Sequence, residues 1–534
     1  MNTFKRNVLL LMQMNPHLDL LSLNSKTSTQ AKNTSDSKAW FLNQNPLPLK
    51  DLYIYGFEAG LFEVTKDWLA QDKRHFLTII EDDYTKFIPL LHEESFKEIL
   101  KNPQIFIKIF STPIGQNWGQ NTKEWENFFW IFANRVYQFL VFGKNLEKAN
   151  YLKLYLEKGF KSSKEYFSYV FKWSLLEYSN FYANIQEAPK SLSGKILNNS
   201  FKNIPAIICG AGSSLEKHLT QLPNFAKKAL LLAPGTSFSI LAKNQINPHF
   251  SFGIDPTDKQ IVRTKDYPAN VPFIYTNTFN KDALKLVKGD KFLFSWKDFL
   301  SIATYLENKC GIPSTELNVG SSATYFCMNV AKWMGCNPIL FIGLDLSFTN
   351  NRYALMKDDN ENPITFNAYD VNHNEIKTTW DFLVEKTLIE DFALKNPKLT
   401  LINCTEGGLS IEGIPYQSFE ETIKNYLWQE HPIEEKIHSL LNSHPIADKE
   451  VKVVLKDWRH NLENFLISQS HNEKVWEIYL RNINQAFERL YAFTIYQMNK
   501  TNDQRIRLEL EIQRQSCFKQ IVQFHLNCLA EAEK

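Results

Sequence analysis

The clearest candidate for ligand chemistry is a glycine- and serine-rich turn near the middle of the chain. Ala206–Cys209 has the composition of a short buried strand, Gly210 and Gly212 follow it, and Ser213–Glu216 can begin a helix with a serine cap and an acidic first turn. Glycines let a ligand approach the backbone closely, and the N–H groups of a helix start favour an anion. The turn therefore predicts a phosphate site, although an ordinary strand-to-helix turn fits the spacing equally well.

A second cluster of the same kind lies about a hundred residues later. The segment NVGSSAT at 318–324 places Gly320, Ser321 and Ser322 at the head of a helix expected over Tyr325–Met334. Two such helix starts can hold the phosphate and the carboxylate of one nucleotide-sugar. The alternative is ordinary serine capping without a ligand.

Carboxylates end two of the expected strands. The run Phe250–Ile254 leads into Asp255, and the run Ile339–Ile342 leads through a glycine into Asp345. In a parallel sheet these positions lie at the edge where ligands bind. Each Asp can bind sugar hydroxyls, act as a general base or cap the next turn.

Several familiar catalytic motifs are absent from the sequence. It contains no G-x-x-x-x-G-K-[ST] phosphate loop and no H-E-x-x-H zinc motif, and Asp345 is flanked at D-x-D spacing by Gly343 and Ser347. NTP hydrolysis by a P-loop enzyme and zinc-protease chemistry are therefore not expected. We expect no cofactor and no metal site, so that any group transfer is independent of a metal ion.

The elements that must position these residues alternate between strands and helices through about 200–415, which predicts a mainly parallel sheet. The expected strands are 206–209, 229–233, 250–254, 273–275, 291–295, 339–342 and 399–402.

Two further parts flank this centre. On the N-terminal side, strands are expected at 51–55, 76–80 and 105–110 and packed helices at 120–190, after a polar linker at 25–46. The bulky Phe57 and Glu58 in its first turn favour a degenerate Rossmann-like scaffold without a cofactor. After 420 there is no glycine, and amphipathic patterns predict helices.

The predicted fold class is thus α/β with three domains. They are an N-terminal α/β domain with linker and helices at 1–195, a central Rossmann-like domain with a mainly parallel sheet at 196–418, and a helical C-terminal domain at 419–534.

Composition limits which cellular compartment and which partners are expected. The 534 residues carry a net charge of +2 with the basic residues interspersed, which does not favour nucleic acid as a partner. The 7 cysteines include no C-x-x-C pair, so a reducing cytoplasm is expected. No apolar run has the length of a membrane span.

Four separated blocks resemble the motility-associated factor (Maf) proteins of bacteria and occur in the same order. They are CGAGSSL at 209–215, GTSFSILAKNQINPHFSFGIDP at 235–256, NVGSSATYFCMNVAKWMGCNPILFIGLDLSFT at 318–349 and NCTEGGLSIEGI at 403–414. Maf proteins take part in flagellin O-glycosylation, and their central domain is similar to bacterial sialyltransferases. The resemblance implies transfer of a nonulosonic sugar, such as pseudaminic or legionaminic acid, from a CMP-sugar to Ser or Thr of a flagellin-like acceptor.

The same resemblance implies roles for individual residues. It points to Asp255 and Asp345 in catalysis, and it places His373 where sialyltransferases carry a histidine base, although DVNHNE at 370–375 has the composition of a turn. The residues implied in substrate binding are Gly210, Gly212, Ser214, Leu215, Gly320, Ser321 and Ser322.

This chain departs from the Maf pattern at two positions. Ser213 replaces the usual Pro, which changes the rigidity of the loop, and Leu344 replaces a frequent Gln, which removes a polar contact and leaves the donor open. Two alternatives also stay open. One is a transferase similar to the archaeal pterin pyrophosphokinases that use ATP, which leaves the flanking parts unexplained, and the other is a non-catalytic scaffold that binds a nucleotide-sugar.

Overall fold

The computed structural model describes most of the chain, in nine longer ranges with single residues and short pieces between them. These ranges are 2–15, 51–109, 135–265, 270–296, 301–315, 322–348, 365–443, 450–468 and 504–533. The chain divides into two compact units, Met1–Phe171 with Arg481–Phe518 and Lys172–Leu480 with Lys519–Lys534.

The three domains expected from the sequence stay a prediction beside this division into two units. The helix α7 (Leu146–Asn184) runs without a break through the boundary between the units. The helix α16 (Val451–Ser468) and the end of α19 (Gln504–Ala532) belong to the unit that contains the central sheet. Helical composition therefore identified these helices correctly.

The first unit is built on a four-stranded parallel sheet in the order β3-β2-β1-β4. The strands expected near 51–55, 76–80 and 105–110 are all present. The strands are β1 (Asp51–Tyr55), β2 (Phe76–Glu81), β3 (Ile105–Ile109) and β4 (Tyr137–Val141). The helix α1 (Thr3–Met14) precedes them, and α3 (Gly60–Gln71), α4 (Ile88–Leu91) and α5 (Glu94–Lys101) lie between them in the chain.

The fourth strand corrects the expectation that 120–190 is entirely helical. Tyr137 stacks on Tyr53 of β1 with ring centroids 4.5 Å apart, and Phe139 pairs with Tyr53 in the strand register. Tyr137, Phe139 and Val141 stand at alternate positions, a pattern that suits a pleated strand. From Leu146 onward the helical expectation is confirmed by α7. Residues 120–127 and most of the linker at 25–46 lie outside the described residues.

Side chains of the first unit fill the positions at which a Rossmann domain holds its ligand. Glu81 and Asp82 at the end of β2 both form ion pairs with Lys144. Phe57, after β1, stacks on Phe87 with ring centroids 4.1 Å apart. The acidic groups that would bind a ribose are therefore neutralised by the chain itself.

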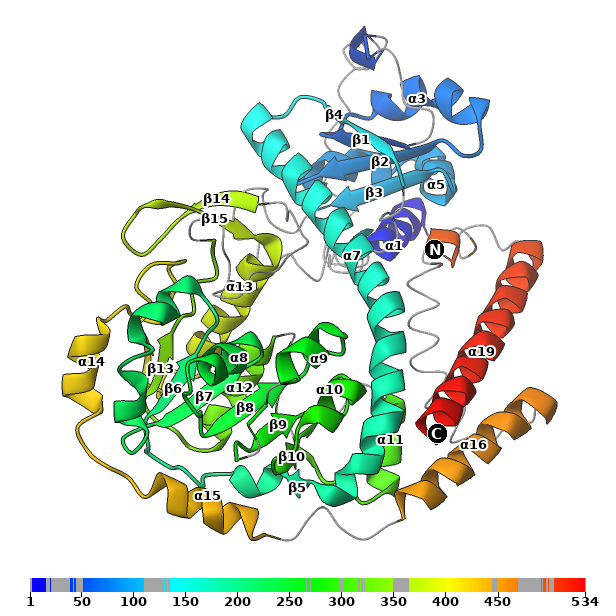
Figure 1. Ribbon diagram of the computed structural model, residues 1–534. Helices are drawn as coiled ribbons and strands as arrows, with labels where there is room; N and C mark the ends of the chain where they lie inside the picture. Colours follow the sequence, from blue (N-terminus) through cyan, green and yellow to red (C-terminus); the bar gives the residue numbers. More distant parts are fainter. Residues whose placement is uncertain are drawn as a thin grey trace. The chain divides into compact units, whose positions relative to one another are not determined.

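The second unit contains an eight-stranded sheet in which every pair is parallel, in the order β16-β13-β6-β7-β8-β9-β10-β5 (Figure 1). This confirms the predicted α/β class. The strands are β5 (Leu192–Ser193), β6 (Ala206–Cys209), β7 (Leu230–Pro234), β8 (Phe250–Gly253), β9 (Phe273–Tyr275), β10 (Lys291–Leu293), β13 (Ile339–Ile342) and β16 (Leu401–Asn403).

Helices connect these strands and cover the sheet. They are α8 (Thr236–Lys243), α9 (Lys259–Thr264), α10 (Lys281–Leu286), α11 (Ser301–Lys309), α12 (Ala323–Trp333) and α13 (Trp380–Lys395). Two short strands, β11 (Ser295–Trp296) and β12 (Ser314–Thr315), flank α11. A hairpin of β14 (Thr365–Tyr369) and β15 (Glu375–Thr379) follows β13.

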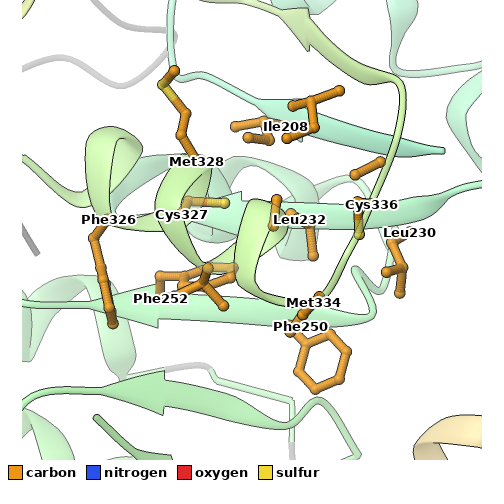
Figure 2. Packing of buried hydrophobic residues seen from close by; sticks show 14 of the residues in the cluster. Ile208, Leu230, Leu232, Phe250, Phe252, Phe326, Cys327, Met328, Met334 and Cys336 are labelled. Atoms are coloured by element: carbon orange, nitrogen blue, oxygen red, sulfur yellow. The ribbon is translucent and has the colours of Figure 1, made fainter. Parts of the chain in front are cut away.

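The core of this unit lies between the sheet and α12. Figure 2 shows Phe326, Cys327 and Met328 of α12 over strand residues such as Ile208 and Phe252, and all five are fully buried. Burying one such side chain stabilises the fold by roughly 1.5–3 kcal/mol. Because every residue of β6, β7, β8 and β13 is buried, both faces of these strands are covered, as is usual in parallel sheets.

The end of the chain is helical in its described part, as predicted. Its helices are α14 (Phe419–Tyr426), α15 (Ile433–Leu441), α16 and α19. Trp458 of α16 donates a hydrogen bond from Nε1 to the Tyr182 hydroxyl of α7 over 2.9 Å, and the same hydroxyl bonds His525 Nδ1 of α19 over 3.0 Å. All three side chains are buried, so this polar cluster joins the C-terminal helices to the second unit.

Candidate functional site

The strand order sets one point of the central sheet apart. From β6 the chain proceeds outward through β7, β8, β9 and β10, and it then returns to place β13 and β16 on the opposite side of β6. The connections that leave β6 and β13 therefore diverge. In open α/β sheets this switch in direction, at the carboxyl ends of the strands, is where ligands bind.

The turn after β6 packs directly against the turn after β13. The Gly212 N–H donates to the Gly343 carbonyl over 2.9 Å, and Gly343 has φ +68°. A side chain at Gly210 would overlap the Gly343 carbonyl, and one at Gly212 would overlap the Asp345 carboxyl group. These glycines, expected for ligand approach, are thus required for the two turns to meet.

Asp345 joins the two turns through its carboxylate. One oxygen accepts from the Ser214 N–H over 3.0 Å and from the Ser213 hydroxyl over 3.1 Å, and the other accepts from the Ser214 hydroxyl. The side chain is buried, and the residues that it holds begin the short helix η5 (Ser213–His218). Asp345 therefore occupies the position at this helix start where an external anion was expected.

The second serine cluster lies at the same edge of the sheet. Ser322 caps α12, because its hydroxyl accepts from the Tyr325 N–H over 3.0 Å, and it also donates to Glu385 of α13 over 2.7 Å. Gly320 has φ +66° and lies against the Tyr325 ring. The head of α12 borders the turn after β7, since a side chain at Gly235 would come within 3.3 Å of Ala323 Cβ. Ser321 lies outside the described residues.

Glu385 is a neighbour of this helix start that sequence reasoning missed. Its burial raises its pKa, while hydrogen bonds from Ser322 and Thr324 act in the opposite direction. It lies 63 residues from Ser322 in the chain. No local pattern links positions that far apart, so only the packing of α13 on α12 could reveal the pair.

Asp255 follows β8 at this edge, two strands from β6. It holds its own turn: one oxygen accepts from the Thr257 N–H over 2.8 Å and from its hydroxyl over 2.7 Å, and the other accepts from Gln260 Nε2 over 2.8 Å. Its side chain is 39% exposed, whereas Asp345 is buried. Of the two predicted carboxylates, Asp255 is therefore the more accessible.

A buried carboxyl group, also missed from the sequence, lies beyond β9. Glu307 of α11 accepts from Asn277 Nδ2 over 2.6 Å and from the Ser295 hydroxyl. Burial raises its pKa to about 7, against the opposing effect of these two donors. The Asn277 Oδ1 atom is buried and has no hydrogen-bond partner among the described residues. A polar, titratable group thus lies at the same sheet edge.

His373 belongs to a different element from these groups: it lies in the turn of the β14–β15 hairpin. Its φ of +63° and its exposure are those of a turn residue, and its N–H donates to the Asp370 carbonyl over 3.0 Å. The expected turn at 370–375 is thereby confirmed. The Val371 N–H of the hairpin donates to the Gly408 carbonyl over 3.0 Å. Because Gly408 lies against the Asp345 backbone, the hairpin borders the Asp345 turn.

The tertiary structure thus sorts the predicted residues into groups. Gly210, Gly212, Ser214, Leu215 and Asp345 form one cluster at the switch point, with the Leu215 side chain buried beneath it. Asp255, Gly320 and Ser322 lie at the same edge of the sheet on other elements. Binding of a donor by these residues stays a prediction.

The described residues contain neither a candidate metal site nor a candidate membrane span. Among these residues, no three His, Cys, Asp or Glu side chains gather in a way that could hold a metal ion. Within the same ranges, no helix combines the length and the apolar character needed to cross a bilayer.

Comparisons with known proteins place this architecture in context. A family model described as 6-hydroxymethylpterin diphosphokinase MptE-like matches residues 179–351. Among solved structures, the chain is similar to the Maf glycosyltransferase from Magnetospirillum magneticum AMB-1, with a TM-score of 0.58 and 15% identity over 98% of this chain and 88% of that one. No curated protein matches the sequence. At this identity the structural likeness establishes a shared fold along nearly the whole chain.

Proposed function

We propose that the protein is a glycosyltransferase of the Maf type. It transfers a pseudaminic- or legionaminic-like sugar from a CMP-sugar to a Ser or Thr hydroxyl of a protein acceptor such as flagellin, in the cytoplasm. The observation that carries this proposal is the fold shared with a Maf glycosyltransferase over both the sheet unit and the flanking parts. A transferase that acts on a protein gives these flanking parts a use, because they can contact the acceptor.

The proposed reaction needs no metal ion. The bond between the sugar and the phosphate of CMP breaks, the acceptor oxygen bonds to the same sugar carbon, and the hydroxyl proton passes to a base. The leaving phosphate gains negative charge, which the helix start at Ser322 can stabilise.

Among the three candidate bases, we propose Asp255. Asp345 is buried, so an acceptor hydroxyl has little access to its carboxylate. His373 lies on an exposed turn with φ +63°. Asp255 combines a place at the sheet edge with partial exposure.

The test incubates the purified full-length protein with CMP-pseudaminic or CMP-legionaminic acid, flagellin and EDTA, and follows the acceptor mass. We expect transfer with EDTA present, at least a hundredfold loss in Asp255→Asn, and activity within threefold of the unchanged protein in His373→Asn, whose side chain tolerates the same φ. Ser322→Ala should lose activity, whereas Ser418→Ala, which removes the matching cap of α14, should not. Transfer that depends on added Mg²⁺ would contradict the mechanism.

A second candidate has a specific observation in its favour. The MptE-like family model covers residues 179–351, which include both serine clusters and Asp345. A parallel reaction with ATP and 6-hydroxymethylpterin therefore tests diphosphate transfer. Formation of AMP and pterin diphosphate would replace the glycosyltransferase proposal, and firm flagellin binding without turnover of any donor would favour the scaffold.

A further inference from the structure

The last turns of α7 contain two buried asparagines at helical spacing. Asn180 and Asn184 are 3% and 2% exposed, and as residues i and i+4 they share one face of the helix. Polar side chains at this depth are found where they form hydrogen bonds. Their partners therefore indicate what this end of the helix holds.

Both asparagines bind loops that follow strands of the central sheet, at the edge formed by the carboxyl ends of the strands. Asn180 Nδ2 donates to the Pro256 carbonyl over 3.0 Å and to the Thr278 carbonyl over 3.2 Å, and its Oδ1 accepts from the Lys281 N–H over 3.0 Å. Pro256 directly follows Asp255. One asparagine thus connects the loop after β8 with the loop after β9.

Asn184 binds the loop after β9, the second of these loops. Its Nδ2 donates to the Asn277 carbonyl over 2.9 Å and to the Phe279 carbonyl over 2.6 Å. The Asn277 side chain is fixed from the other side by Glu307, and its buried Oδ1 has no partner among the described residues. The loop after β9 is thus held by hydrogen bonds from Asn184 on one side and to Glu307 on the other.

The C-terminal helices meet α7 between these two asparagines. The Tyr182 hydroxyl is bonded to Trp458 of α16 and His525 of α19, and Tyr182, Trp458 and His525 are each at most 1% exposed. The asparagines and this buried aromatic cluster all belong to the second compact unit. Within five residues, α7 therefore binds both the ligand-edge loops and the C-terminal helices.

We infer that Asn180 and Asn184 are positioning residues, which fix the loops after β8 and β9, and that Tyr182 makes this fixation depend on α16 and α19. As a statement about ligand binding the inference rests on the proposed function, because it assigns those loops to the donor site. As a statement about the loops it stands without that function. A partner that binds the C-terminal helices would then affect the donor site through this stretch of α7.

The test measures amide hydrogen exchange in the full-length protein for the segments 254–258 and 276–281. Asn180→Leu and Asn184→Leu keep the approximate side-chain volume and remove the hydrogen bonds, and Tyr182→Phe removes only the shared hydroxyl. The matched control is Asn244→Leu, because Asn244 Nδ2 donates to the Ile240 carbonyl of its own helix over 2.8 Å. If Asn184→Leu does not fold, Asn184→Ser replaces it.

We expect exchange in both segments to rise at least tenfold in Asn180→Leu, and in 276–281 in Asn184→Leu. Tyr182→Phe should raise exchange in these loop segments at least threefold, and Asn244→Leu should leave their exchange unchanged. Unchanged exchange in the folded asparagine variants, or an equal rise throughout the unit, would overturn the positioning role. Unchanged loop exchange in Tyr182→Phe would overturn the dependence on the C-terminal helices.

Titration with CMP separates this inference from the proposed function. Positioned loops predict CMP binding at least fivefold weaker in Asn184→Leu than in Asn244→Leu. Equal affinity would overturn the link to the donor site. If the unchanged protein does not bind CMP, the proposed function fails, and the exchange measurements still decide whether α7 fixes the loops.

Discussion

The Ser214 hydroxyl donates to the Asp345 carboxylate although the two residues lie 131 positions apart in the chain. This bond joins the turns after β6 and β13 at the switch point of the sheet. It makes Asp345 an internal anion for the first turn of η5. The Asp345 side chain therefore contributes to the stability of both turns.

Replacing Asp345 by Asn should destabilise the protein. The amide retains one acceptor but presents N–H groups to the Ser214 N–H or to a serine hydroxyl, so a buried donor loses its partner. We expect the free energy of unfolding to fall by about 1–3 kcal/mol, measured by denaturant unfolding without ligand. Asp370→Asn is the control, because Asp370 holds the exposed hairpin turn through two N–H bonds of 2.8 Å. An unchanged unfolding curve for Asp345→Asn would contradict the assigned role.

Replacing Gly212 by Ala tests the contact between the two turns. Gly212 has φ −61° and ψ 160°, which alanine adopts freely, so any cost arises from overlap with the Asp345 carboxyl group. Overpacking of this kind costs about 1–3 kcal/mol. In a double-mutant cycle, Asp345→Ala should remove at least half of the Gly212→Ala cost. Strictly additive effects would show that the two residues do not interact.

Replacing Glu307 by Gln should stabilise the protein above neutral pH. Burial raises the pKa of Glu307 to about 7, above that in the unfolded chain, so the folded state prefers the protonated form and loses stability as pH rises from about 4.5 to 7. Glutamine removes that charge, and its amide can donate to Asn277 Oδ1 if the Asn277 amide turns over. We expect a gain of about 1–3 kcal/mol at pH 8, with a smaller difference at pH 5. Lower stability of Glu307→Gln at pH 8 would count against this account.

Two buried histidines should make the protein sensitive to acid. Burial lowers the pKa of His525 to about 3 and that of His249 to about 4, so the unfolded chain takes up protons first as pH falls. Their contribution is complete above about pH 6.5 and decreases by about 1.4 kcal/mol per pH unit for each histidine below it, until the folded pKa is reached. Glu307 has the opposite dependence over part of this range.

The histidine effect can be isolated by substitution. His525→Gln keeps an acceptor for the Tyr182 hydroxyl but does not titrate, so the slope of unfolding free energy between pH 6 and 4.5 should fall by about 1 kcal/mol per unit. His460→Gln, at an exposed position of α16, should leave the slope unchanged. Equal slopes for His525→Gln and the unchanged protein would refute the assignment.

The sequence by itself determined the type of most elements and the edge of the sheet at which most of the candidate residues lie. Short apolar runs ending in Gly, Ser or Asp identified β6, β8 and β13, because alternation of strands and helices forces a parallel sheet whose carboxyl ends share one side. Local composition also marked the turn that contains His373.

Only the tertiary structure decided which of these residues meet. Gly212 and Asp345 were each interpretable as ligand contacts, and their mutual contact depends on β13 returning beside β6 across more than a hundred residues. Glu385, Glu307 and the asparagines of α7 gave no local signal, since an isolated Glu or Asn on a helix looks the same whether it faces solvent or a buried carbonyl. β4 was missed for a related reason: its aromatic residues suit a helix or a strand, and pairing with β1 selected the strand.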